Sequence, residues 1–134
     1  MSIAVTASYY LEKMEFSEAA ILLEKYREEY PEDLDSLRAL GRAYLGLRNY
    51  QNALEVFTEL HKRDKDNIDA LHSVARCLYW LGNYKKSYAY ASHAIKNAGP
   101  NEAYLLTRGL AAQKGGLTEE AESDFRALLE ISPN

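Results

Sequence analysis

The 134-residue chain is poor in the residues and segments that mark secreted or membrane proteins, with three prolines and a single cysteine, Cys77. One cysteine cannot form a disulfide within the chain, so nothing favours an oxidising compartment. No apolar run approaches the roughly 20 residues that a membrane-spanning helix needs. The first ten residues also lack the basic flank and the long apolar stretch of a signal peptide. These absences predict a soluble, cytoplasmic protein.

Charge of neither sign dominates the sequence. The 16 lysines and arginines and the 20 aspartates and glutamates give a formal net charge of −4. That imbalance is too mild to favour electrostatic capture of nucleic acid or of an anionic membrane. We therefore expect neither nucleic acid nor a membrane as a partner.

The residue types that carry chemistry form no catalytic or ligand pattern. His61, His72 and His93 are not spaced as metal ligands, with one another or with Cys77, whereas zinc sites usually need closely paired cysteines or histidines. The glycines at 115–116 lie in no phosphate-binding motif. The sequence predicts a protein that is not an enzyme and that uses no metal or cofactor.

What the sequence does contain is a period of 34 residues, which recurs in large and in small residues alike. Members of the period are Tyr10 and Tyr44; Leu37, Leu71 and Leu105; Ala19, Ala53, Ser87 and Ala121; and, two periods apart, Gly41 and Gly109. Such a period is typical of arrays of helical hairpins. Cut without gaps, the chain forms a single array of four units, at residues 1–33, 34–67, 68–101 and 102–134.

Each unit contains two segments with apolar residues at helical spacing. In the second unit, Leu37, Leu40 and Tyr44 share one face of the first segment. Residues 46–49 break the pattern with turn-forming residues, Gly46 among them. At the corresponding breaks, 82–83 and 115–116, we expect glycine to end the helix in the left-handed conformation. Because no stretch of period two is present, strands are not expected. The fold class is therefore all-α, with eight helices in four antiparallel pairs.

Small residues at fixed places in the period predict close approach of the paired helices. Gly41, Ala75 and Gly109 share one position, in the first segment of their units. Ala53 stands at the small position of the second segment, where a bulky side chain would force the two helices apart. Leu40 and Tyr44 on the first helix of the second unit are then expected to meet Ala53 and Phe57 on its partner helix.

At these positions the chain resembles the tetratricopeptide repeat family. The family pattern asks for a large residue, Leu-Gly, Tyr, a small residue, an aromatic residue, a second small residue and a closing Pro. The second unit matches it with Leu37, Leu40, Gly41, Tyr44, Ala53 and Phe57, and the fourth with Leu105, Gly109, Ala121, Phe125 and Pro133. Arg108 replaces the leucine in the fourth unit, and Ala91 replaces the aromatic residue in the third. The resemblance implies a right-handed α-solenoid that binds other proteins.

The same resemblance implies where a partner would bind, because the first helix of each unit in the family lines a concave groove. The residues expected to line this groove and to bind the partner are Arg38, Arg42, His72, Arg76, Tyr79, Trp80, Leu106 and Leu110. Their chemistry favours a peptide or helix of a partner protein, with acidic character. In the alternative interpretation, Asp35 and Asp69 neutralise the cations along their own helices, and Tyr79 and Trp80 pack against neighbours.

Two functions fit these residues. The first is a non-enzymatic adaptor or scaffold that holds a peptide or helix in the groove. The alternative is a dedicated chaperone for one client, since residues 113–117 and 121–123 are loosely similar to the small chaperones of bacterial type III secretion translocators. The sequence also ends with the fourth unit, so we expect Phe125, Leu128, Leu129 and Ile131 to stay partly exposed. Self-association through this C-terminal end is a further expectation.

Overall fold

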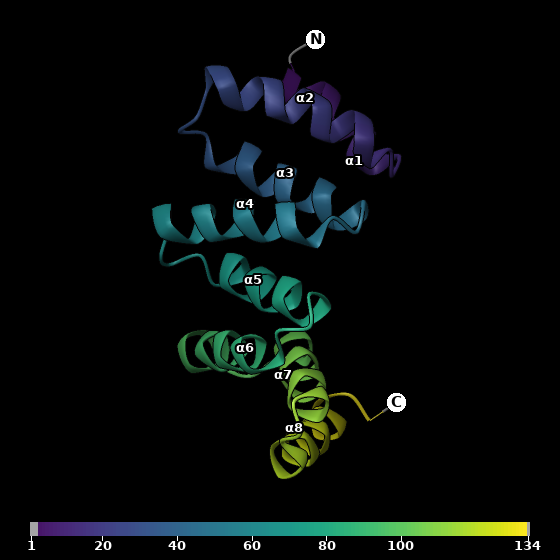
Figure 1. Ribbon diagram of the computed structural model, residues 1–134, viewed down its shortest axis with the longest axis vertical. Helices are drawn as coiled ribbons and strands as arrows, with labels where there is room; N and C mark the ends of the chain where they lie inside the picture. The colour runs from purple at the N-terminus through teal and green to yellow at the C-terminus, as the bar shows by residue number, and fades with distance from the viewer. Residues whose placement is uncertain (1–2, 134) are drawn as a thin grey trace. The chain divides into compact units, whose positions relative to one another are not determined.

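The computed structural model describes residues 3–133, and within that range it contains eight α-helices and no strand (Figure 1). The helices are α1 (Ile3–Glu12), α2 (Phe16–Glu29), α3 (Leu34–Gly46), α4 (Tyr50–Arg63), α5 (Ile68–Trp80), α6 (Tyr84–Ala98), α7 (Glu102–Lys114) and α8 (Thr118–Ile131). Consecutive helices pack in pairs, α1 with α2 through α7 with α8. The predicted all-α fold of four helix pairs is confirmed. None of the described helices is both long and apolar enough to cross a bilayer.

The chain divides into two compact units, Met1–Asp64 with α1 to α4 and Lys65–Asn134 with α5 to α8. In the first unit, the hydroxyl of Tyr44 on α3 donates a hydrogen bond to Glu24 on α2 (3.0 Å), and Arg27 on α2 pairs with Glu59 on α4. Both bonds join the first helix pair to the second. The finer division into units at residues 34, 68 and 102 stays a prediction.

The turn inside each helix pair has the same hydrogen bond and the same backbone conformation. The amide at the start of the second helix donates to a carbonyl five residues earlier, as in Asn49 to Tyr44 (2.9 Å) and Asn83 to Leu78 (2.9 Å). One residue before that amide, the chain adopts a positive φ, at Met14, Arg48, Gly82 and Gly116. These four positions are 34 residues apart, and the bond is the one that closes a Schellman motif.

Gly46 was expected to be a turn residue, and this expectation is wrong. Helix α3 continues through Gly46, and Arg48 takes the positive φ instead. Gly46 is small for a different reason: a Cβ there would collide with the ring of Phe16 on α2. The glycine therefore permits close packing of α3 against the preceding helix pair.

The first helices of the second, third and fourth pairs begin at capped positions that also follow the period. Asp33, Asn67 and Asn101 each accept hydrogen bonds from backbone amides in the first turn of the helix that follows. Such N-caps satisfy amides that would otherwise lack a partner, and each contributes about 1 kcal/mol.

Helices within a pair approach closely at the predicted small positions. Ala19, Ala53, Ser87 and Ala121 are all buried. Opposite them, a Cβ added to Gly41 would lie 2.5 Å from Cζ of Phe57, and one added to Gly109 would lie 2.8 Å from Cε1 of Phe125. In the first pair, Ala7 stands in place of the glycine and Leu23 in place of the phenylalanine, and both are buried. The larger residue on the first helix therefore faces a smaller one on the second. In the first, second and fourth pairs, the side chains at these two positions thus compensate for each other in volume.

Candidate partner-binding surface

In the first unit, the predicted groove residues Arg38 and Arg42 are both exposed on α3. Arg38 forms an ion pair with Asp35 one turn earlier (3.4 Å), as the alternative interpretation expected. Both partners are well exposed, so this pair contributes little to stability. Arg42 forms no ion pair within residues 3–133. It is the cation on α3 that is available to a ligand.

In the second unit, α5 and α7 lie side by side and are joined by two side-chain hydrogen bonds. Nε2 of His72 on α5 lies 2.8 Å from Oγ1 of Thr107 on α7. The hydroxyl of Tyr104 on α7 donates to Asp69 on α5 (3.1 Å), and its ring packs against the ring of His72. Asp69 is therefore used to bind α7. It does not neutralise Arg76, which differs from the alternative interpretation.

His72 was expected to be an exposed groove residue, and this expectation is wrong. Its side chain is buried, with 9% of its surface exposed, between Thr107 and Tyr104. Burial, helped by the nearby charge of Arg76, lowers the pKa of His72 from 6.5 to about 4. The imidazole is therefore neutral at physiological pH. It joins two helices and offers no cation to a ligand.

The other predicted residues on these two helices form a surface of mixed chemistry, which we call the α5–α7 face and define as Arg76, Trp80, Leu106 and Leu110. Trp80 is 59% exposed and Leu106 43% exposed, while Leu110 is half-buried. Arg76 is exposed and forms no ion pair in the described part of the chain. An indole, two leucines and an unpaired cation thus lie on adjoining helices.

Tyr79 supports this face from one side. Its ring packs edge-on against Trp80, with centroids 5.3 Å apart, and against Tyr84 of α6, with centroids 5.6 Å apart. Edge-to-face aromatic pairs contribute about 0.5–1.5 kcal/mol beyond their buried area. Tyr79 is half-buried. Its main observed contacts hold Trp80 in place at the C-terminal end of α5.

Cys77, also on α5, is fully buried. Burial raises the pKa of its thiol to about 12. A thiol that stays protonated is a poor nucleophile and a poor metal ligand. The residue contributes packing to the interior of the second unit.

The sequence reasoning missed an ion pair between α7 and α8. Nε and Nη2 of Arg108 donate to the two carboxylate oxygens of Asp124, at 2.8 and 2.6 Å, and Asp124 is buried. The guanidinium also lies over the ring of Tyr88 on α6. In the second helix pair, α3 and α4, the matching positions hold Leu40 and Val56, both buried. The sequence could have revealed this ion pair, because two positions that are apolar in the second helix pair carry opposite charges in the fourth.

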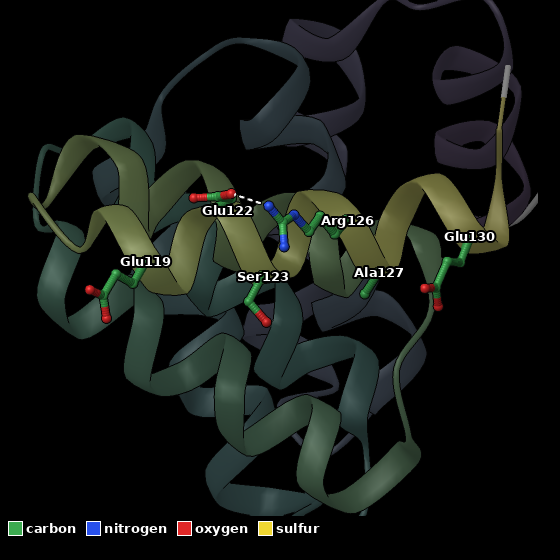
Figure 2. Close-up of a pocket in the computed structure, with 6 residues that line it drawn as sticks. All are labelled: Glu119, Glu122, Ser123, Arg126, Ala127 and Glu130. Carbon is green, nitrogen blue, oxygen red and sulfur yellow. Dashed lines mark hydrogen bonds and ion pairs between the residues drawn. The ribbon is translucent and has the colours of Figure 1, made fainter.

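The outer face of α8 carries a shallow, charged hollow (Figure 2). Figure 2 shows its side chains along one helix, among them Glu119, Glu122, Arg126 and Glu130, with an ion pair between Glu122 and Arg126. The hollow is open to solvent. It differs from the α5–α7 face in having no large apolar side chain.

Comparison with known proteins places these features in a family. The family model described as "Anaphase-promoting complex, cyclosome, subunit 3" matches residues 46–126, more than half of the chain. The chain is 32% identical over 88 residues, 66% of its length, to Superkiller complex protein 3 of Homo sapiens. It is 25% identical over 99 residues to the peptidyl-prolyl cis-trans isomerase PASTICCINO1 of Arabidopsis thaliana. The chain spans only 6% and 16% of the length of these two relatives.

Solved structures show the same fold at low sequence identity. MamA from Desulfovibrio magneticus RS-1 superposes with a TM-score of 0.92 at 19% identity, over 98% of this chain and 74% of that one. YrrB, described as "a TPR protein with an unusual peptide-binding site", superposes with a TM-score of 0.90 at 17% identity, over 98% of this chain and 68% of that one. The fold is thus an α-solenoid of the tetratricopeptide repeat type. With the family match, this chain belongs to the anaphase-promoting complex, cyclosome, subunit 3 family of tetratricopeptide repeat proteins.

Proposed function

We propose that the chain is a non-enzymatic adaptor or scaffold of the cytoplasm, which binds a peptide or helix of a partner protein. The observation that carries this proposal is the α5–α7 face, where Trp80 and Leu106 are exposed beside the unpaired Arg76. Tryptophan and arginine are over-represented among the residues that dominate protein–protein binding energies. The peptide-binding site in the description of YrrB supports the same class of function.

The chemistry of the face indicates the chemistry of the partner. Arg76 offers a charge to a carboxylate, and Leu106 and Leu110 offer contact to an apolar side chain. On α3 of the first unit, Arg38 and Arg42 are the corresponding predicted contacts, and Arg42 lacks an ion pair among the described residues. A peptide that combines acidic and large apolar residues fits both sets. Tyr79 positions Trp80, and His72 positions α7 against α5.

We propose neither an isomerase activity nor a dedicated chaperone function for this chain. The relative named as a peptidyl-prolyl isomerase matches this chain over only 16% of its own length, so its name supports no isomerase activity here. No observation favours the dedicated chaperone over the adaptor.

Self-association through the C-terminal end is also part of the proposal. Leu129 is 60% exposed and Ile131 is exposed on α8, and a hollow between α7 and α8 is lined by Ala121, Phe125 and Leu129. One period earlier, Ile95 packs against the buried cluster that includes Tyr104 of the next helix. A second copy would cover Leu129 in a similar way. Sedimentation should show association that rises with concentration and is lost in Leu129→Glu; a monomer at all concentrations would contradict it.

A peptide-display selection tests the main proposal. Peptides selected against the whole chain should contain acidic and large apolar residues, and Trp80→Ala should weaken their binding at least about tenfold, or 1.4 kcal/mol. Tyr30→Ala, which removes another exposed aromatic side chain from α2's C-terminal cap, is the matched control and should leave binding unchanged. Selected peptides that bind Trp80→Ala as tightly as the natural sequence would contradict the proposed face.

A further inference from the structure

The helix pair of α5 and α6 contains almost no acidic residue. The chain has 20 aspartates and glutamates, yet none lies between Asp69 and Glu102. That interval covers nearly all of α5 and the whole of α6, and its cations are Arg76, Lys85, Lys86 and Lys96. A chain with a net charge of −4 therefore contains a local excess of positive charge.

On α6 these cations share one side of the helix. Lys85, Lys86, Tyr90, His93 and Lys96 are all exposed, and we call them the α6 basic face. At 3.6 residues per turn they occupy less than half of the helix circumference. The opposite side holds the buried residues Ser87, Ala91 and Ala94. From Lys85 to Lys96 the face is about 17 Å long, at 1.5 Å per residue.

The fold makes no visible use of these charges. None of the three lysines forms an ion pair within residues 3–133, whereas five arginines of the same chain take part in ion pairs with carboxylates, Arg108 among them. Lys85 and Lys86 also lie in the first turn of α6, where the helix dipole disfavours cations. The first turn has no acidic residue, and Asn83 makes no side-chain capping bond. Lys85 and Lys86 therefore lie where the helix dipole disfavours them and form no ion pair in return. Residues that oppose a local preference without a structural benefit indicate a function.

We propose that the α6 basic face is a second docking surface, separate from the α5–α7 face, and that it binds a short acidic segment of a partner protein. The lysines would pair with carboxylates, and the half-exposed ring of Tyr90 would contact an apolar residue beside them. The length of the face suits a few residues of extended chain, which span about 3.3 Å each.

Charge elsewhere in the second unit favours a short acidic peptide over a nucleic acid. The outer face of α8 has Glu119, Glu122 and Glu130 against a single cation, Arg126 (Figure 2). A long polyanion would be repelled by such a surface, and stable binding to nucleic acid needs many phosphate contacts. The three lysines and one histidine of the α6 basic face could make only a few phosphate contacts. The same count argues against an anionic membrane as the ligand.

The test is a titration of the whole ¹⁵N-labelled chain with a short synthetic glutamate-rich peptide, followed by NMR. Amide shifts should concentrate at Lys85, Lys86, His93 and Lys96, and they should weaken as salt is raised, because exposed charges are screened over about 8 Å at physiological ionic strength. Reversal of the three lysines to glutamate should weaken binding about tenfold or more. The paired control, Lys25→Glu with Lys62→Glu on α2 and α4, should bind as the natural sequence does.

The variant with the three lysines changed to glutamate should remain folded, because glutamate in the first turn of α6 interacts favourably with the helix dipole. Its thermal midpoint should equal or exceed that of the natural sequence. Shifts confined to Arg42 and Arg76, or equal binding by the reversed variant, would overturn the α6 proposal and leave the α5–α7 face intact. Tighter binding to a DNA oligonucleotide or to phosphatidylserine vesicles than to the peptide would overturn the choice of a protein segment.

Discussion

Replacement of Gly41 by alanine tests how tightly the paired helices pack. Gly41 lies inside α3, and a Cβ there would lie 2.5 Å from Cζ and 2.8 Å from Cε1 and Cε2 of Phe57. Phe57 is buried, so its ring cannot swing into solvent. Alanine in a helix interior gains about 1 kcal/mol over glycine, whereas overpacking costs about 1–3 kcal/mol. Gly41→Ala should therefore lower the free energy of unfolding by about 1 kcal/mol.

The chain itself contains the compensating change. In the first helix pair, Ala7 and Leu23 occupy the positions of Gly41 and Phe57, and both are buried. Phe57→Leu alone should cost about 1 kcal/mol, because it leaves unfilled volume beside Gly41. The double variant copies the Ala7–Leu23 combination and should return to within about 0.5 kcal/mol of the natural sequence. The coupling energy between the two sites would then be about 2 kcal/mol.

Urea unfolding followed by circular dichroism gives the four free energies of this cycle. The slope of each transition should stay the same, because no variant changes the surface that unfolding exposes. Lys62→Ala, an exposed substitution on α4, should change stability by less than about 0.5 kcal/mol and serves as the control. Additive effects of Gly41→Ala and Phe57→Leu would refute the proposed exchange of volume.

Three other predictions concern the turns, the buried ion pair and pH. Arg48→Gly should stabilise the fold by up to about 1 kcal/mol in thermal unfolding, because Arg48 has a positive φ, and Gly82→Ala should destabilise it by a similar amount; the same sign for both would contradict the shared turn. Arg108→Leu alone should cost about 3–5 kcal/mol in chemical denaturation, since it leaves Asp124 buried without a partner. Adding Asp124→Val should restore most of that loss, and an unrescued double variant would show that the pair is not replaceable. Because the folded-state pKa of His72 is about 4 and the unfolded value 6.5, the unfolded chain binds the proton first. Stability should therefore be complete above pH 6.5 and fall by about 2–3 kcal/mol toward pH 4; His72→Gln should flatten this fall, and an unchanged pH profile would contradict the lowered pKa.

The repeat was readable from the sequence because a period of 34 residues constrains many positions at once. Large residues such as Leu37 and small residues such as Ala53 must both recur for successive helix pairs to pack, and both are buried in the structure. The N-caps of α3, α5 and α7 follow the same period in the structure. The helical fold thus follows from local spacing, which a single sequence displays.

The details that were mispredicted depend on contacts that spacing does not display. Gly46 looks like a turn residue, but its size is required by Phe16 from another helix pair. Arg48 adopts a positive φ because the turn bond from Asn49 to Tyr44 imposes it, although arginine does not prefer that conformation. His72 stands at a position that is expected to be exposed in the tetratricopeptide repeat family. In this chain, the ring of Tyr104 on the adjoining helix packs against it and covers it.

The candidate site was predicted only as a set of positions. Spacing identified Arg76, Trp80 and Leu106 as members of first helices, and all three side chains are exposed. Spacing could not show that Asp69 is engaged by Tyr104, which leaves Arg76 without an ion pair among the described residues. The basic face of α6 does not show in the net charge of the whole chain, which is negative.

Site-specific photo-crosslinking tests the central claim, that a partner protein binds the face presented by α5 and α7. A photoreactive amino acid would replace Leu106, which is 43% exposed on α7, and in a control chain it would replace the exposed Ile21 on α2. After irradiation in extract from the native source, crosslinked proteins would be identified by mass spectrometry. We expect a protein that is crosslinked at position 106, is absent at position 21, and is lost when Trp80→Ala is added. The same crosslinked proteins at both positions, or a crosslink at position 106 that survives Trp80→Ala at full yield, would contradict it.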